Sequence, residues 1–175
     1  MRYDEGPWED AMKDWTLDDS ARVWVHLANR RMTADEACMV QLHLDQFVAG
    51  WQAHGAALTA QALVVNGWMV VLAVDERPQQ PTGCSIDASV SALKQIAGLH
   101  PSMADLDVFD RMAVLHRPAS GSTWTRTSLS TFWAQRKAGL LDDSEHVFDT
   151  TVSTLRELKT RGVVPMAASW HAAMW

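Results

Sequence analysis

An α+β fold is predicted by three features of the 175-residue sequence. Two apolar strand patterns flank the dipeptide Asn66-Gly67, which predicts a β-hairpin because both central positions of a type I′ turn need positive φ. Thr33 and Glu36 form a capping box that opens a segment of helical periodicity. Apolar residues make up 47% of the chain and charged residues 21%, which indicates a folded domain with a buried core.

The first four elements follow from these patterns. Residues 22–28, RVWVHLA, form the first predicted strand, and the capping box then opens the first helix. Apolar residues at helical spacing continue through Trp51, and His54 extends the same stripe into the last turn of this predicted helix. Residues 58–65 and 68–76 form the second and third strands, joined by the hairpin turn.

The next two elements complete a known topology. Residues 81–87, PTGCSID, lead into a second helix that ends near Gly98, and residues 108–116, VFDRMAVLH, form a fourth strand. The order β-α-β-β-α-β is that of a ferredoxin-like fold, an antiparallel sheet with strand order 4-1-3-2. Strands 1 and 3 are apolar at nearly every position, as central strands should be, so we expect strand 3 to lie between strands 1 and 2.

Two further helices are predicted beyond this core, over residues 127–138 and 149–161. Because both faces of strands 1 and 3 are apolar, a second layer must cover the face that the first two helices leave open. We expect these C-terminal helices to provide it, with a second copy of the chain in a homodimer as the alternative cover. The residues expected to pack there are Phe132, Trp133, Leu155 and Leu158.

The length is suited to a single domain with three parts. These are an N-terminal extension (1–19), the ferredoxin-like core (20–117) and a helical C-terminal extension packed on the core (118–175). The start of the chain lacks the basic flank and apolar stretch of a signal peptide, and the longest apolar run, residues 68–74, is too short to span a bilayer. We therefore expect a cytoplasmic protein without a membrane partner.

Charge and cysteine content exclude two further classes. The net charge is −6, with 21 acidic and 15 basic residues, and no stretch concentrates Lys and Arg, so no nucleic-acid partner is expected. The two cysteines cannot build a disulfide framework, and no C-x-x-C pair indicates structural zinc. No metal and no cofactor is therefore expected.

One motif places a cysteine thiol at the start of a predicted helix. In PTGCSID, Cys84 lies where the second helix begins, and unpaired N–H groups at a helix N-terminus stabilise a thiolate. The predicted topology brings the end of strand 3 and the end of the first helix to one edge of the sheet, so Cys84 and His54 should meet there. His54 or His116 would then serve as base or counter-ion, and Asp87 or Asp75 would orient the imidazole. The candidate catalytic residues are Cys84, His54 and Asp87.

Further polar and aromatic residues are expected around the same place. His54, Cys84, His116 and a carboxylate form an alternative ligand set for a transition metal, although their spacing matches no familiar zinc motif. The tail, which carries His171, should dock on the core, either towards this site or away from it. The candidate binding residues are Ser85, Asp75, His116, Trp51 and His171.

A simpler interpretation of PTGCSID remains open, in which Ser85 or Asp87 only caps the helix and Cys84 packs as a small apolar residue. Two functions follow. Either the Cys84 end of the sheet binds a small molecule, with or without thiol chemistry, or the protein is a non-catalytic interaction module or homodimer. A partly exposed Cys84 in a cleft favours the first and a fully buried Cys84 the second. Cys38, on the first helix, is expected to be buried and structural.

Five segments carry a resemblance to known proteins: SARVWVHLANRRMTADE, FVAGWQAHGAAL, VLAVDERPQQPTGCSIDASV, VFD with TTVSTL, and VPMAASWH. Together, from Ser20 to His171, they resemble a family of small uncharacterised bacterial proteins often labelled automatically as ABC transporter ATPases. Such an ATPase needs a glycine-rich loop ending in Gly-Lys-Ser or Gly-Lys-Thr, and none of the nine glycines here is followed by lysine. The resemblance therefore implies neither ATPase activity nor a mechanism.

Overall fold

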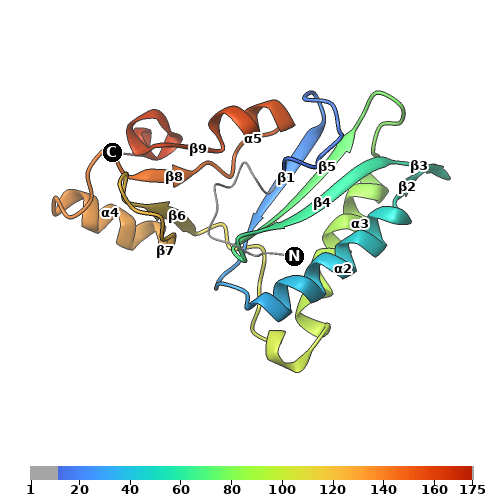
Figure 1. Ribbon diagram of the computed structural model, residues 1–175, viewed down its shortest axis with the longest axis horizontal. Helices are drawn as coiled ribbons and strands as arrows, with labels where there is room; N and C mark the ends of the chain where they lie inside the picture. Colours follow the sequence, from blue (N-terminus) through green and yellow to red (C-terminus); the bar gives the residue numbers. More distant parts are fainter. Residues whose placement is uncertain (1–11, 175) are drawn as a thin grey trace.

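A computed structural model describes residues 12–174 and shows two larger antiparallel sheets, a short two-stranded ribbon and the helices packed against them (Figure 1). The α+β class predicted from the sequence is confirmed. The first sheet has the order β1-β5-β4. Its strands are β1 (Arg22–Leu27), β4 (Thr59–Val65) and β5 (Met69–Asp75), and the ribbon is formed by β2 (Gln52–Ala53) and β3 (Ala56–Ala57).

The second sheet has the order β7-β6-β8-β9. Its strands are β6 (Ala113–Arg117), β7 (Thr125–Ser128), β8 (His146–Phe148) and β9 (Val163–Pro165). The helices are α2 (Ala34–Ala49), α3 (Gly83–Lys94), α4 (Leu129–Lys137) and α5 (Leu155–Arg161). In Figure 1, α2 and α3 lie along one face of the first sheet, α5 lies on its other side, and α4 lies with the second sheet.

The centre of the first sheet is confirmed as predicted. β5 pairs antiparallel with both β1 and β4, and all seven of its residues are buried. Asn66 and Gly67 have φ values of 51° and 70°, so both residues of the predicted turn adopt the positive φ that the hairpin requires. Strand 3 therefore lies between strands 1 and 2.

The predicted order 4-1-3-2 is wrong for its fourth strand. β6 pairs with β7 and β8 instead of β1, so the first sheet ends at β1. Among the described residues, one backbone hydrogen bond joins the segment before β6 to β1, in which the Asp110 N–H donates to the Leu27 carbonyl over 3.1 Å. The Asp110 carboxylate accepts from Arg126 Nε of β7 over 2.6 Å, which ties this segment to the second sheet. β1, expected as a central strand, is an edge strand.

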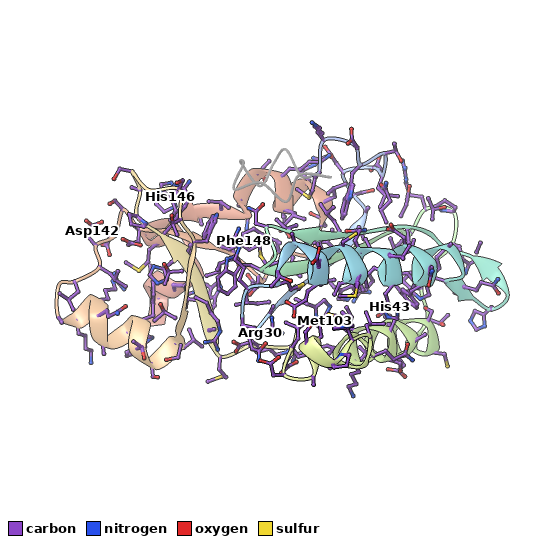
Figure 2. The ribbon with its side chains drawn as sticks, turned by 60° about the horizontal axis from the view of Figure 1, so that its bottom comes forward. Arg30, His43, Met103, Asp142, His146 and Phe148 are labelled. Atoms are coloured by element: carbon purple, nitrogen blue, oxygen red, sulfur yellow. The ribbon has the colours of Figure 1, made fainter. Side chains whose placement is uncertain are left out.

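The second face of the first sheet is covered by α5, in agreement with the prediction. Leu155 and Leu158 are fully buried in one cluster with Val23 and Val71 of the sheet. Phe148, labelled in Figure 2 between the two halves of the molecule, belongs to the same cluster. The chain that leaves β8 of the second sheet and continues into α5 therefore covers the core of the first sheet.

The prediction is wrong for Phe132, and with it for α4. Phe132 is fully buried against the second sheet, because α4 follows β7 directly and packs on that sheet. Trp133, on the same helix, is partly buried. The C-terminal region expected to be helical also contains the strands β7, β8 and β9. The residues packed with Phe132 are Val114, Val147, Met166, Leu129, Leu141 and Val164.

The start of α2 is as predicted and its end is not. Thr33 is the N-cap: its hydroxyl accepts from the Glu36 N–H over 3.2 Å, and its own N–H donates to the Glu36 carboxylate over 2.9 Å. The helix ends at Ala49, so His54 lies outside it. His54 and Gly55 have φ values of 53° and 80° and form the turn between β2 and β3. The expectation of a helical, buried His54 is therefore wrong.

A side chain of α2 covers the outer edge of β4. The Gln41 Oε1 atom accepts from the Val64 N–H over 2.8 Å, and its Nε2 atom donates to the Ala62 carbonyl over 3.1 Å and to Asp45 over 2.8 Å. The carboxamide thus pairs with a C=O and an N–H two residues apart, as a neighbouring strand would. Gln41 is buried, and its carboxamide blocks the pairing of another strand with the Ala62 carbonyl and the Val64 N–H.

We predict that Gln41→Glu destabilises the fold by about 2 kcal/mol, because the carboxylate cannot donate to the Ala62 carbonyl and adds a negative charge beside Asp45. Urea denaturation measures the loss. Gln46→Glu is the matched control, since Gln46 is exposed on the same helix. An equal loss in both variants would assign the effect to helix charge and contradict the role given to Gln41.

Candidate functional site

Two of the predicted binding residues meet where α3 begins. Trp51 is buried, and its Nε1 donates to the Ser85 carbonyl over 2.8 Å, which joins the end of the α2 region to the first turn of α3. Ser85 is also buried, and its hydroxyl accepts from the Thr82 N–H over 2.7 Å. Thr82 is the N-cap of α3, and Ser85 completes a capping box with it, so the predicted capping role is confirmed for Ser85, whereas Asp87 takes no part in the cap.

The three candidate catalytic residues are exposed. Cys84 and Asp87 belong to the first two turns of α3, and His54 lies in the β2–β3 turn. Within residues 12–174, no hydrogen bond or ion pair joins Cys84, His54 and Asp87, and none of them lines either of the two cavities described below. Their arrangement as nucleophile, base and orienting group stays a prediction.

The remaining predicted residues are elsewhere or already paired. Asp75, at the end of β5, is buried and accepts from Arg77 Nη2 over 2.6 Å. This hydrogen bond is the main reason that the pKa of Asp75 lies below its usual value. His116 and His171 lie in the second sheet and near the C-terminus, where each packs against the ring of Phe132. In the described part of the chain, no three potential ligands are grouped to hold a metal ion.

His116 takes part in a chain of hydrogen bonds that resembles a catalytic triad in its order of groups. Its Nε2 atom lies 2.8 Å from Thr127 Oγ1 and its Nδ1 atom 3.1 Å from Glu145 Oε2. However, the His116 and Glu145 side chains are only 7% and 12% exposed, and Phe132 packs edge-on against the imidazole. Since buried polar groups need partners, we assign these bonds to holding β6, β7 and the loop before β8 together.

A cavity of about 480 Å³ lies along the free edge of β1. This volume falls in the range of sites for small ligands. It occupies the side of β1 on which the fourth strand was expected. A second cavity, of about 410 Å³, lies at the start of α2 beside the β4–β5 turn. The first cavity is lined by residues 22–27, 108–111 and 150–153 and by Trp170.

Backbone groups of β1 are left open in this cavity. The backbone N–H and C=O groups of Val23, Val25 and Leu27 point away from β5. Two of these groups are bonded: the Val23 N–H donates to the Ser153 carbonyl over 2.9 Å, and the Leu27 carbonyl accepts from the Asp110 N–H. Between these two bonds lie the Val23 carbonyl, both backbone groups of Val25 and the Leu27 N–H. None of these four groups has a hydrogen-bond partner among residues 12–174. These backbone N–H and C=O groups on the edge of β1 are available to hydrogen-bond with a ligand.

Aromatic rings and one arginine surround the open edge. His26 packs edge-on against Phe109, with 5.3 Å between the ring centroids. Burial, helped by the positive charge of Arg111, lowers the pKa of His26 to about 4, so its ring is neutral near pH 7. Arg111 is exposed and has no ion-pair partner in the described residues. The indole Nε1 of Trp170 is buried and has no hydrogen-bond partner there either.

Sequence reasoning missed this site because it assigned β1 to the centre of the sheet. The available signal was the adjacent pair Asp110 and Arg111 within the predicted fourth strand. Consecutive charges point to opposite faces of a strand, which conflicts with a strand between two apolar layers. The conflict indicated that this segment does not continue the first sheet.

Comparison with protein-family models, with curated proteins and with solved structures finds no match to this chain. No helix in residues 12–174 is long and apolar enough to cross a membrane.

The two thiols offer a direct test of the predicted nucleophile. Cys38, expected to be buried, is exposed on α2, as Cys84 is on α3. We predict that iodoacetamide alkylates Cys84 faster than Cys38 at neutral pH. Cys84 lies in a first turn without acidic residues, whereas Cys38 follows Asp35 and Glu36 within its helix, and only the thiolate attacks.

Mass spectrometry of the Cys38→Ser and Cys84→Ser variants measures each thiol alone. Adding His54→Ala to Cys38→Ser should slow the alkylation of Cys84 if the imidazole supports the thiolate. Equal rates for the two thiols, unchanged by His54→Ala, would exclude a poised nucleophile.

Proposed function

We propose that this protein binds a ligand in the β1 cavity through an amide group that pairs with the open backbone edge. The observation that carries the proposal is a set of four backbone groups between Val23 and Leu27 that have no hydrogen-bond partner within residues 12–174, at the wall of a cavity of about 480 Å³. The other edge of the same sheet supports it. There, the Gln41 carboxamide occupies a C=O and N–H pair of the kind that β1 leaves open.

The cavity favours recognition over catalysis. It contains no cysteine, and its histidine, His26, has a pKa of about 4 and lies against Phe109. Among the described lining residues the one carboxylate is that of Asp110, which is engaged by Arg126. A ligand would therefore meet hydrogen-bonding backbone, aromatic rings and the charge of Arg111 instead of a nucleophile and a base.

The second candidate is thiol chemistry at Cys84, and the observation that favours it is the exposure of this side chain in the first turn of α3. A homodimer is a third arrangement compatible with a non-catalytic role. Two free cysteines suit a reducing compartment, so a cytoplasmic location is part of the proposal.

An NMR titration with N-acetylglycinamide tests the proposal. We expect the largest shifts at the Val25 and Leu27 amides and none with methyl acetate, which has no N–H donor. Val25→Pro removes the open donor without removing a bond to β5, because this N–H points away from β5, and should abolish the shifts. Val25→Ala is the matched control. Shifts that avoid β1, or that persist in Val25→Pro, would refute the proposal.

A further inference from the structure

The open edge of β1 is longer than one amide group. It presents two consecutive pairs, the Val23 carbonyl with the Val25 N–H and the Val25 carbonyl with the Leu27 N–H. At about 3.3 Å per residue, the stretch from Val23 to Leu27 spans about 13 Å. A single carboxamide fills one pair, whereas an extended polypeptide fills both at the correct spacing.

Both ends of this edge are closed. At one end, Leu155 donates to the Ala21 carbonyl and Val23 donates to Ser153, which forms an antiparallel bridge. At the other end, Asn29 donates to the Asp107 carbonyl over 2.8 Å. A full strand of a folded partner, or β1 of a second copy, would collide with these segments, so only a short flexible stretch of chain can enter from the side of the cavity.

The charged side chains that line the cavity favour an acidic ligand. Two arginines line it, Arg22 and Arg111, while Asp110 is neutralised by Arg126. Arg22 lies over the ring of Trp24 and 3.5 Å from Glu76, whereas Arg111 has no ion-pair partner within residues 12–174. The cavity thus has a surplus of positive charge in a chain whose net charge is −6. Electrostatic complementarity favours a carboxylate beside Arg111.

We infer that the ligand is an extended peptide segment of three or four residues that carries an acidic side chain and pairs antiparallel with β1. This inference rests on the proposed function and names the ligand class of the same site. Recognition by strand addition takes affinity from the backbone and specificity from alternate side chains. The acidic side chain would contact Arg111, and apolar neighbours would contact the rings of Trp24, Phe109 and Trp170.

The experiment uses two blocked peptides, N-acetyl-Val-Asp-Val-amide and its neutral isostere N-acetyl-Val-Asn-Val-amide, titrated against the full chain and followed at the Val25 and Leu27 amides. We expect the Asp peptide to bind about threefold more tightly, as for one partly exposed ion pair. Arg111→Gln should remove this difference between the Asp and Asn peptides.

Two N-methylated forms of the Asp peptide test the strand pairing. Alternate N–H groups of an extended chain face opposite sides, so methylation of two adjacent residues should abolish binding at one position and spare it at the other. This test does not depend on any variant of the protein folding correctly.

The outcomes separate the two proposals. Equal affinity of the Asp and Asn peptides would overturn the acidic preference. Equal binding of both N-methylated peptides would overturn the strand pairing. If N-acetylglycinamide shifts β1 and neither peptide does, the peptide inference fails and the proposed function stands. If none of the three probes shifts β1, both fail.

Discussion

A chain that ends at Arg117 will not unfold cooperatively and will expose apolar surface. It keeps β6 without its partners β7 and β8, and it loses α5 from the second face of the first sheet. The loss of α5 also removes Leu155 and Leu158, which are both fully buried against that face. Burial of apolar side chains is the main favourable contribution to folding, so the shortened chain loses a large part of its core.

Urea denaturation, size-exclusion chromatography and binding of a hydrophobic dye measure this loss. The milder variant Leu155→Ala keeps the full chain and should cost about 3 kcal/mol, whereas Leu140→Ala, at a position 73% exposed, should cost little. If the chain ending at Arg117 stayed monomeric with a sharp unfolding transition, the role of α5 as the essential cover would be wrong.

Arg30→Ala is expected to destabilise the fold about as much as Leu155→Ala. Arg30, labelled in Figure 2, donates to both oxygens of Glu36 over 2.8 and 3.0 Å, to Asp105 over 2.9 Å and to the Ser102 carbonyl over 2.9 Å. It thereby joins the chain after β1 to the start of α2 and to the segment after α3. Removing it leaves Glu36, which is only 4% exposed, without its cation, at a cost of about 3 kcal/mol.

The loss of stability caused by Arg30→Ala should depend on pH. The hydrogen bonds from Arg30 are the main reason that the pKa of Glu36 falls from 4.5 to about 2 in the folded protein. A lowered folded pKa gives stability that is fully present above the unfolded value and lost as pH falls through the folded value. The difference between the wild type and Arg30→Ala should therefore be largest above pH 4.5 and shrink towards pH 2.

Urea denaturation at several pH values measures this difference. Arg156→Ala, which removes an exposed arginine from α5, is the control and should show no comparable pH dependence. A stability difference that stays constant from neutral pH to pH 2 would contradict the coupling of Arg30 to Glu36.

The elements that the sequence predicts correctly are those specified by neighbouring residues. The Asn66-Gly67 turn and the Thr33 capping box depend on contacts within four residues, and both are present. The hairpin then aligns β4 with β5 over its whole length. His54 shows where such local patterns fail, because α2 ends before Gly50 and the residues that follow form a short ribbon in which Ala53 is buried and His54 lies in the exposed turn.

The partner of β6 could not be predicted from local patterns. Residues 108–116 are equally compatible with pairing to β1 or to a sheet of their own, and the choice depends on distant groups such as Arg126 and Glu145. Gln41 is similar, since a polar residue on a helix gives no indication that its amide will close the edge of β4. For the same reason the β1 cavity was not foreseen, while Cys84 was identified from its position at a helix start.

Amide hydrogen exchange in β1 tests the central claim of an open edge most directly. The Val23 N–H is bonded to Ser153 and the Val64 N–H to Gln41, whereas the Val25 and Leu27 N–H groups have no partner in the described residues. The account predicts that Val25 and Leu27 exchange much faster than Val23 and Val64 in the ligand-free protein, measured residue by residue by NMR. Protection of Val25 and Leu27 equal to that of Val23 would mean that this edge is already paired, and would contradict it.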